Sequence, residues 1–187
     1  LGKALSAALN EEILTLAKAG CTWIQVDEPV FARKPDKALD YGIENLERCF
    51  HGLPDHVARA VHICCGYPDY LDQENFQKAD QMAYLQLSDA IEDSSIQAIS
   101  LEDAHRHNDL SLLEHFKTTT VMLGVIAIAN SRIETVAEIT ERLQAALKHI
   151  DADRLIAAPD CGLGFLDREL ALAKLTNMVS AAKSVSG

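Results

Sequence analysis

Four side chains of the types that bind thiophilic metals occur at three separate points of the chain. His62 and Cys64 are two residues apart, Glu102 ends a short apolar run, and Cys161 lies in a Pro-Asp-Cys-Gly turn. Residues two apart on a strand point to the same face, so His62 and Cys64 can reach one metal ion. Zn²⁺ accepts thiolate, imidazole and carboxylate ligands together in a tetrahedral site. The pattern therefore predicts a zinc site.

The same residues have a second interpretation. Cysteine is among the most buried residue types, and a histidine at the end of a strand often only satisfies a backbone carbonyl. On the residues alone, buried thiols without a metal stay an open alternative. The chain has five cysteines, an odd number without a secretory signal, which argues against a disulfide framework. We interpret Cys21, Cys49 and Cys65 as structural.

The elements that must position these side chains form one recurring pattern. A stretch with helical spacing is followed by a short apolar run, and each run ends in a polar cluster. The expected strands are residues 22–26, 60–63, 96–101, 121–128 and 155–158. The expected helices are residues 4–19, 41–50, 69–87, 111–116, 135–150 and 168–184, and Thr135 and Glu138 form a capping box at the start of the fifth. Such alternation is typical of an α/β fold with a parallel sheet.

Two parallel architectures compete for this pattern. A doubly wound sheet usually has a glycine-rich turn after its first strand, and Asp27-Glu28-Pro29 is no phosphate-binding loop. A (β/α)8 TIM barrel carries its chemistry at the C-terminal ends of the strands, where the polar residues lie here. We therefore expect a barrel. Five strands are too few to close one, so residues 1–187 are expected to be its C-terminal part, about the last five βα units.

Composition and charge limit the class of partner. The chain has 187 residues, of which 48% are hydrophobic and 24% charged, and its formal net charge is −11. An acidic chain without clustered Lys and Arg is unsuited to nucleic acid. No apolar run reaches the roughly 20 residues that span a bilayer. We expect a soluble, cytoplasmic protein with a small-molecule ligand, and no nucleic-acid or membrane partner.

Four segments resemble, in order and spacing, the C-terminal catalytic barrel of cobalamin-independent methionine synthases, and the similarity runs over nearly the whole chain. They are residues 24–29 (IQVDEP), 61–64 (VHIC), 98–102 (AISLE) and 158–163 (APDCGL). The resemblance implies that His62, Cys64, Glu102 and Cys161 bind zinc and form the catalytic centre. It also implies that Asp27 binds the amino group of homocysteine. The expected enzyme is a methyltransferase of methionine biosynthesis, in which zinc activates the homocysteine thiol.

The chain departs from this family on the side of the methyl donor. The family's Asp-Ile-His motif, whose His is implicated in protonating the folate leaving group, aligns with Ala127, Ile128 and Ala129. Alanine cannot act as a general acid. His105 and His107 are candidates for a replacement. The donor is therefore methyltetrahydrofolate or an alternative: a methyl-corrinoid protein or, as in the related coenzyme M transferases, an epoxide.

Two other outcomes are weighed against a homocysteine methyltransferase. One is a related thiol alkyltransferase with another acceptor, such as coenzyme M. The other is a non-catalytic barrel fragment in which zinc only stabilises the fold. An open five-stranded sheet would also leave edge groups unpaired. We therefore expect a homo-oligomer or an N-terminal barrel segment outside this sequence.

Overall fold

The five strands form a single parallel sheet in the order β1-β2-β3-β4-β5. The structure is a computed structural model, and it describes residues 1–73 and 75–185. A doubly wound sheet reverses its strand order at a switch point, whereas here sequence neighbours are also sheet neighbours throughout. The order is that of a (β/α)8 barrel, so the prediction of a partial barrel of five parallel strands is confirmed.

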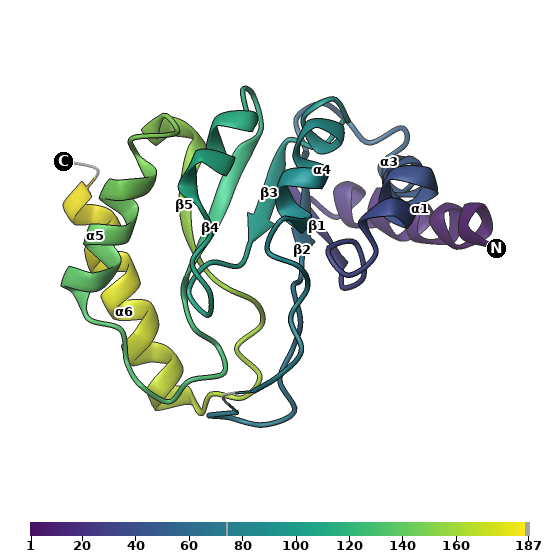
Figure 1. Cartoon of the computed structure of the whole chain (residues 1–187). Helices are drawn as coiled ribbons and strands as arrows, with labels where there is room; N and C mark the ends of the chain where they lie inside the picture. Colours follow the sequence, from purple (N-terminus) through teal and green to yellow (C-terminus); the bar gives the residue numbers. More distant parts are fainter. Residues whose placement is uncertain (74, 186–187) are drawn as a thin grey trace.

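The elements alternate along the chain as expected (Figure 1). The strands are β1 (Trp23–Glu28), β2 (Ala58–Ile63), β3 (Ala98–Leu101), β4 (Thr120–Ile126) and β5 (Leu155–Pro159). The α-helices are α1 (Gly2–Lys18), α2 (Pro35–Lys37), α3 (Ile43–Cys49), α4 (Ala83–Glu92), α5 (Val136–Ala146) and α6 (Arg168–Val185). A π-helical turn, η1 (Ala38–Gly42), and two 3₁₀ segments, η2 (Leu110–His115) and η3 (Ala152–Arg154), complete the set.

The two faces of the sheet differ in chemistry. Val61 and Ile63 of β2 belong to the main apolar core, together with residues of the helices. Ala60 and His62 alternate with them and are buried outside that core. Because side chains on a strand alternate between faces, one face packs on helices and the other carries small and polar groups. His62 lies on this second face, which corresponds to the inside of a barrel.

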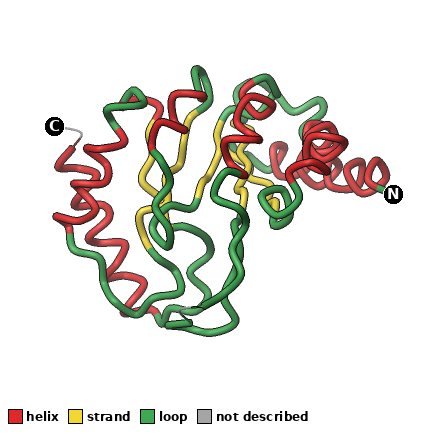
Figure 2. The backbone as a smooth tube through the Cα atoms, in the orientation of Figure 1, coloured by secondary structure: helices red, strands yellow, loops and turns green. Residues whose placement is uncertain are grey.

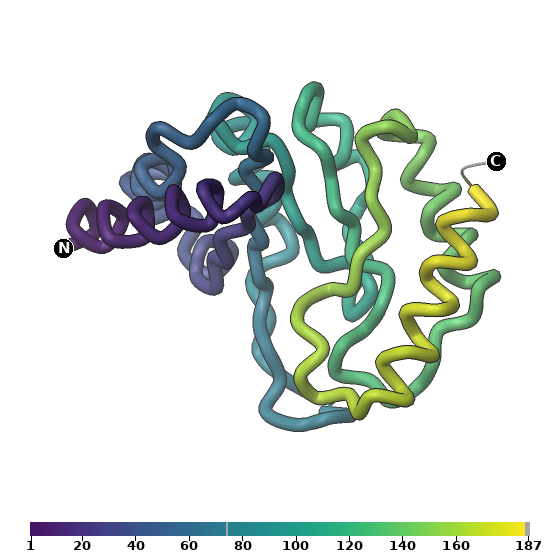
Figure 3. The backbone as a smooth tube through the Cα atoms, turned by 180° about the vertical axis from the view of Figure 1, so that it is seen from behind, coloured from purple at the N-terminus to yellow at the C-terminus, as the bar shows by residue number. Residues whose placement is uncertain are grey.

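The helices are spread along the sheet, and α4 packs near its middle, in one core with residues of β2 and β3. Helices α1 and α3 lie beside β1, while α5 and α6 lie beside β4 and β5 (Figure 1). Seen from behind, α1 and α6 again lie on opposite sides of the molecule (Figure 3). The long connections gather beyond the C-terminal ends of the strands (Figure 2). No helix in the described part of the chain combines the length and apolar character needed to cross a membrane.

One predicted helix begins much later than expected. The apolar spacing of residues 69–87 predicts a helix, but α4 starts only at Ala83. The preceding backbone bonds to other parts of the chain: the Asp72 N–H donates to the Ala129 carbonyl (2.7 Å) and the Ala79 N–H to the Cys65 carbonyl (2.7 Å). These long-range bonds replace the local ones of a helix. The segment becomes a loop that reaches from β2 to the end of β4.

Candidate metal centre

The register of β1, β2 and β3 brings the predicted ligands together. Asp27 of β1 is paired with His62 of β2, and His62 is paired with Ser100 of β3. Cys64 and Glu102 each follow the last residue of their strand by one position. Consecutive parallel strands end at the same edge of the sheet, so these side chains converge there.

Cys161 completes a compact cluster from the turn after β5. His62, Cys64, Glu102 and Cys161 each offer one ligand atom, and these atoms all lie within 4.8 Å of one another. His62, Cys64 and Glu102 are only 5–6% exposed, and Cys161 is half-buried. In a tetrahedral zinc site with bonds of about 2.0 to 2.3 Å, the ligand atoms are separated by roughly 3.3 to 3.8 Å. The limit of 4.8 Å is about 1 Å wider than this spacing, so the four ligand atoms lie close to the arrangement of a closed zinc site.

His62 has one ring nitrogen fixed and one without a partner. Its Nδ1 lies 2.9 Å from the Ser100 hydroxyl, which orients the ring. Its Nε2 is buried and has no hydrogen-bond partner among the described residues. Buried polar atoms are nearly always paired, so an orphan nitrogen beside two thiols and a carboxylate needs an explanation. A metal ion supplies one, because a metal-bound histidine usually has its second nitrogen held by a hydrogen bond.

Glu102 is held from two directions. Its Oε1 accepts a hydrogen bond from the Cys65 N–H (2.9 Å). The Tyr84 hydroxyl accepts from the Glu102 N–H (3.0 Å) and donates to the Ile63 carbonyl (2.8 Å), which joins β3 to β2. Burial, and then the negative charge of Cys64, raise the pKa of Glu102 to about 8.

The two cysteines of the cluster shift each other's pKa in opposite directions. Interaction with Cys161 and burial raise the pKa of Cys64 to about 11, whereas interaction with Cys64 lowers the pKa of Cys161. Burial lowers the pKa of His62, but Cys64, Glu102 and Asp27 outweigh that effect and raise it overall. Three of the four groups, His62, Cys64 and Glu102, thus hold their protons more tightly than they would in water, because ionisable groups are crowded together at one buried place. The donor set therefore fits zinc.

Asp27 lies at the rim of this cluster rather than in it. Its side chain is exposed, and one carboxylate oxygen accepts from the Gln25 amide (2.8 Å). Because Asp27 is paired with His62, its carboxylate faces the approach to the cluster from β1. An exposed carboxylate at this place is free to bind an ammonium group by a charge-assisted hydrogen bond.

Neither His105 nor His107, the two candidates to replace the family's general acid, has the properties of a proton donor at this site. The Nε2 of His105 accepts a hydrogen bond from the Ala129 N–H (3.1 Å), and burial lowers the pKa of His105 to about 4. The ring is therefore neutral at pH 7. His107 is largely exposed, its Nδ1 lies 3.3 Å from the buried Asp103 carboxylate, and it is not among the four clustered residues.

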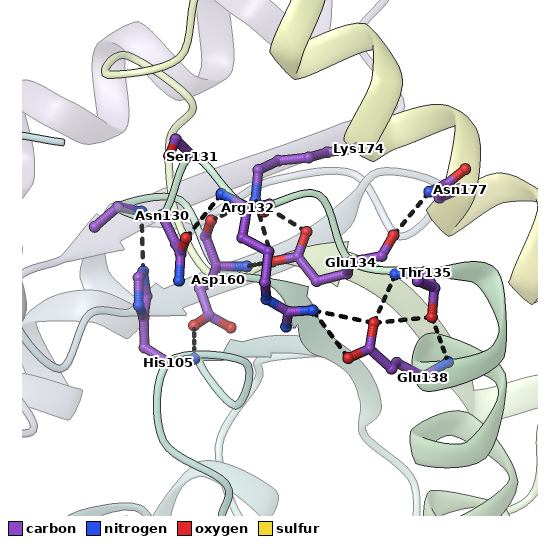
Figure 4. Close-up of polar contacts among 12 residues, drawn as sticks. His105, Asn130, Ser131, Arg132, Glu134, Thr135, Glu138, Asp160, Lys174 and Asn177 are labelled. Carbon is purple, nitrogen blue, oxygen red and sulfur yellow. Dashed lines mark hydrogen bonds and ion pairs between the residues drawn. The ribbon is translucent and has the colours of Figure 1, made fainter. Parts of the chain in front are cut away.

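Residues 127–134, which begin with the three positions of the donor-side motif, are fixed by a buried ion pair. Lys174 of α6 is fully buried and lies 2.9 Å from Glu134; it also donates to the carbonyls of Ala127 (3.1 Å) and Arg132 (2.6 Å). Glu134 in turn accepts from the Ala127 N–H (3.0 Å). Figure 4 shows Lys174 reaching from α6 into this network. These contacts hold residues 127–134 in place, and we call this segment the wall after β4.

Sequence reasoning did not find the residues that support the cluster. Ser100 and Tyr84 contact ligands from 38 and 18 residues away along the chain. For Ser100 a signal exists, since it lies on β3 and precedes Glu102 by two positions. Tyr84 has none, because its role depends on where α4 packs.

The chain is similar to known proteins over nearly its whole length. The family described as "Cobalamin-independent synthase, Catalytic domain" matches residues 2–184. A methionine synthase from Pyrococcus abyssi is 34% identical over 97% of this chain and 48% of its own length. A methionine synthase from Thermococcus kodakarensis is 32% identical over the same shares. The chain therefore spans about half the length of these relatives.

Among solved structures, the chain is similar to a B12-independent methionine synthase from a Shewanella species in complex with selenomethionine. The TM-score is 0.88 at 34% identity, over 97% of this chain and 53% of that one. A methyltransferase from Methanosarcina mazei shares the fold, with a TM-score of 0.69 at 17% identity.

Proposed function

Since this chain belongs to the catalytic-domain family of cobalamin-independent methionine synthases, we propose that it carries the part of a homocysteine S-methyltransferase that binds zinc and activates the substrate thiol. The observation that carries the proposal is the buried cluster of His62, Cys64, Glu102 and Cys161, with its ligand atoms within 4.8 Å and the His62 Nε2 unpartnered among the described residues. These four residues would hold the metal. When bound, zinc supplies the Lewis acidity that keeps a thiol deprotonated at neutral pH.

The residues of the chain have distinct tasks in this reaction. Ser100 orients the His62 ring, while the Cys65 N–H and the Tyr84 hydroxyl hold Glu102. Asp27 at the rim binds the ammonium group of the amino-acid substrate. In the transfer itself, a bond forms between the substrate sulfur and the methyl carbon. The bond between that carbon and the donor breaks, and the donor keeps the electron pair.

The bound ligand of a similar protein supports homocysteine as the acceptor. Selenomethionine, present in the Shewanella structure, is the selenium counterpart of methionine, the product of homocysteine methylation. The exposed Asp27 carboxylate is suited to the amino group that homocysteine and methionine share. Coenzyme M has no amino group, so Asp27 favours the amino-acid acceptor.

The composition of the wall after β4 favours a second possibility for the donor. Ala127 and Ala129 carry no ionisable group, and His105 is neutral because its pKa is about 4. A folate donor leaves as an amine that needs a proton, whereas a methyl-corrinoid donor leaves without one. The alternative is therefore a corrinoid donor. Initial rates with methyltetrahydrofolate and methylcobalamin, each with homocysteine, would distinguish the two.

The open sheet edges support the proposal that residues 1–187 form the C-terminal part of a barrel. Leu5 and Leu9 on α1 are 57% and 49% exposed, and Trp23 on β1 is 46% exposed. At the other edge, Ile156 of β5 and Leu172 of α6 are 40% and 51% exposed. Further strands between β5 and β1, from the same chain or from a second copy, would cover both surfaces. Light scattering gives the oligomeric state that separates these cases.

The first experiment is the zinc content of the purified protein, measured by elemental analysis beside Cys64→Ser and Cys161→Ser variants. Cys21→Ser is the matched control, because Cys21 is exposed and lies outside the cluster. We expect about one zinc per chain in the wild type and in the control, and loss of zinc in both cluster variants. A wild type free of zinc, prepared without chelators, would contradict the proposal.

A further inference from the structure

Asp160 occupies an unusual position beside the cluster. It follows the last residue of β5, immediately precedes Cys161, and is completely buried. Its carboxylate accepts three backbone N–H groups: Oδ1 accepts from Asp103 and Ala104 (both 2.8 Å), and Oδ2 accepts from His105 (2.8 Å). Figure 4 shows the Asp160 side chain directed at the His105 backbone. One buried side chain thus accepts hydrogen bonds from three consecutive residues of the loop that follows β3.

The loop that it holds begins directly after another predicted ligand. Asp103 follows Glu102 at the end of β3, while Asp160 belongs to the end of β5. Strand β4 lies between these two strands, so neither backbone bonds to the other within the sheet. The Asp160 carboxylate therefore makes a direct link between the strand ends that carry Glu102 and Cys161.

Gly124 of β4 makes this link sterically feasible. A Cβ atom at Gly124 would collide with the Asp160 Oδ1 and would lie 2.9 Å from its Cα. No side chain other than hydrogen therefore leaves room for the carboxylate to cross β4. The loop is also anchored from its other side, where Arg142 of α5 donates to both carboxylate oxygens of Asp103 (2.6 and 2.8 Å).

We propose that Asp160 is a positioning residue that fixes Glu102 and Cys161 relative to each other and so preorganises the metal site. The inference rests on the proposed function, because it assumes that the two residues bind the same ion. Outer partners of metal ligands typically contribute 10- to 100-fold to metal affinity, since they orient the ligands before the metal arrives. Asp160 acts on two ligands at once, through the backbone of one and as the chain neighbour of the other.

The hydrogen-bond pattern predicts a graded response to substitution. In Asp160→Asn, one oxygen can still accept from Asp103 and Ala104, but the amide NH₂ would face the His105 N–H, and two donors cannot pair. In Asp160→Ala, all three N–H groups lose their acceptor. We therefore expect zinc affinity to fall about tenfold in the first variant and about 100-fold in the second.

The test measures metal affinity of the metal-free protein by competition with a chromophoric chelator, using Zn²⁺, and records the visible spectrum after loading with Co²⁺. Asp109→Asn is the matched control: Asp109 lies in the same loop, is exposed, and caps the Ser111 N–H (3.0 Å) without touching β5. Gly124→Ala provides a second route, because the added methyl group would displace the Asp160 carboxylate without removing it, although it also lies 2.9 Å from the Asp160 Cα and 3.0 Å from the Leu101 carbonyl oxygen. Thermal unfolding of each metal-free variant reports whether it folds.

Reduced affinity and an altered Co²⁺ spectrum in Asp160→Asn and Gly124→Ala, with the control unchanged, would support the positioning role. Should Asp160→Ala or Gly124→Ala fail to fold, Asp160→Asn, which keeps the size of the side chain, decides the outcome. A folded Asp160→Asn that binds zinc as tightly as the wild type, with the same spectrum, would overturn the inference. Failure of the wild type to bind zinc would instead remove the proposed function, so the two failures are distinguishable.

Discussion

Replacing Lys174 by methionine tests whether the wall after β4 depends on its buried ion pair. Lys174 is fully buried, and Glu134 is 6% exposed. Lys174 lies 2.9 Å from one carboxylate oxygen of Glu134 and 3.1 Å from the other. Methionine has nearly the same length but no charge and no donor. The substitution leaves the Glu134 carboxylate buried with the Ala127 N–H as its remaining hydrogen-bond donor.

The size of the effect follows from the unpaired charge. Removing one partner of a buried ion pair costs about 3 to 5 kcal/mol, because the other charge stays in a medium of low dielectric constant. For a chain of this size, about 2 to 4 °C of melting temperature is lost per kcal/mol. We therefore expect Lys174→Met to melt roughly 6 to 20 °C below the wild type. Adding Glu134→Gln removes the charge, so the double variant should lose only about 1 to 3 kcal/mol, for unpaired polar groups.

The assay is thermal unfolding followed by circular dichroism, with urea unfolding to obtain free energies. Lys183→Met is the control, because Lys183 is an exposed lysine of the same helix. Its substitution should change the stability by less than about 0.5 kcal/mol. If Lys174→Met and Lys183→Met unfolded at the same temperature, or if Glu134→Gln worsened the first variant, the ion pair would not have the assigned role.

Three other expectations concern the cluster and its surroundings. Tyr84→Phe leaves the buried Glu102 N–H without its acceptor and should lower the free energy of unfolding in urea by about 1 to 3 kcal/mol. A decrease below about 0.5 kcal/mol, the size expected for an ordinary surface substitution, would contradict this. Burial raises the pKa of Glu28 to about 7, above its unfolded value, so its contribution to stability is present at low pH and is lost as the pH rises from about 5 to 8. Glu28→Gln should therefore flatten the fall in stability of the metal-free protein between pH 6 and pH 8, and an unchanged slope would count against it. Removing metal with a chelator should lower the melting temperature of the wild type but not that of Cys161→Ser, because ligand binding stabilises only the folded state that can bind; equal shifts in both would exclude Cys161 as a ligand.

Local features of the sequence were sufficient for the elements and for the chemistry of the cluster. Alternating apolar runs and helical stretches predicted five parallel strands, which the structure contains. The capping box of Thr135 and Glu138 is present at the start of α5. Both features are local, because a strand face or a helix cap is fixed by residues a few positions apart. The ligand types at the strand ends could be read in the same way.

The helix predicted over residues 69–87 was wrong in its part before α4, because the backbone there bonds to distant residues. Asp72 adopts a positive φ of 61° and donates its N–H to Ala129. A Cβ at Gly66 would collide with the Gln77 carbonyl, so the loop packs directly against the end of β2. Apolar spacing cannot report such contacts, since their energy depends on what lies next to the segment in space.

The sequence by itself therefore determined which groups could bind a metal, and at which strand ends they lie. Only the tertiary structure decided how they are held: Ser100 on His62, Tyr84 on Glu102, and Asp160 across β4. The separations of these partners along the chain range from 18 to 57 residues. A hydrogen bond depends on distances of a few tenths of an ångström, and only the packed fold sets them between residues so far apart.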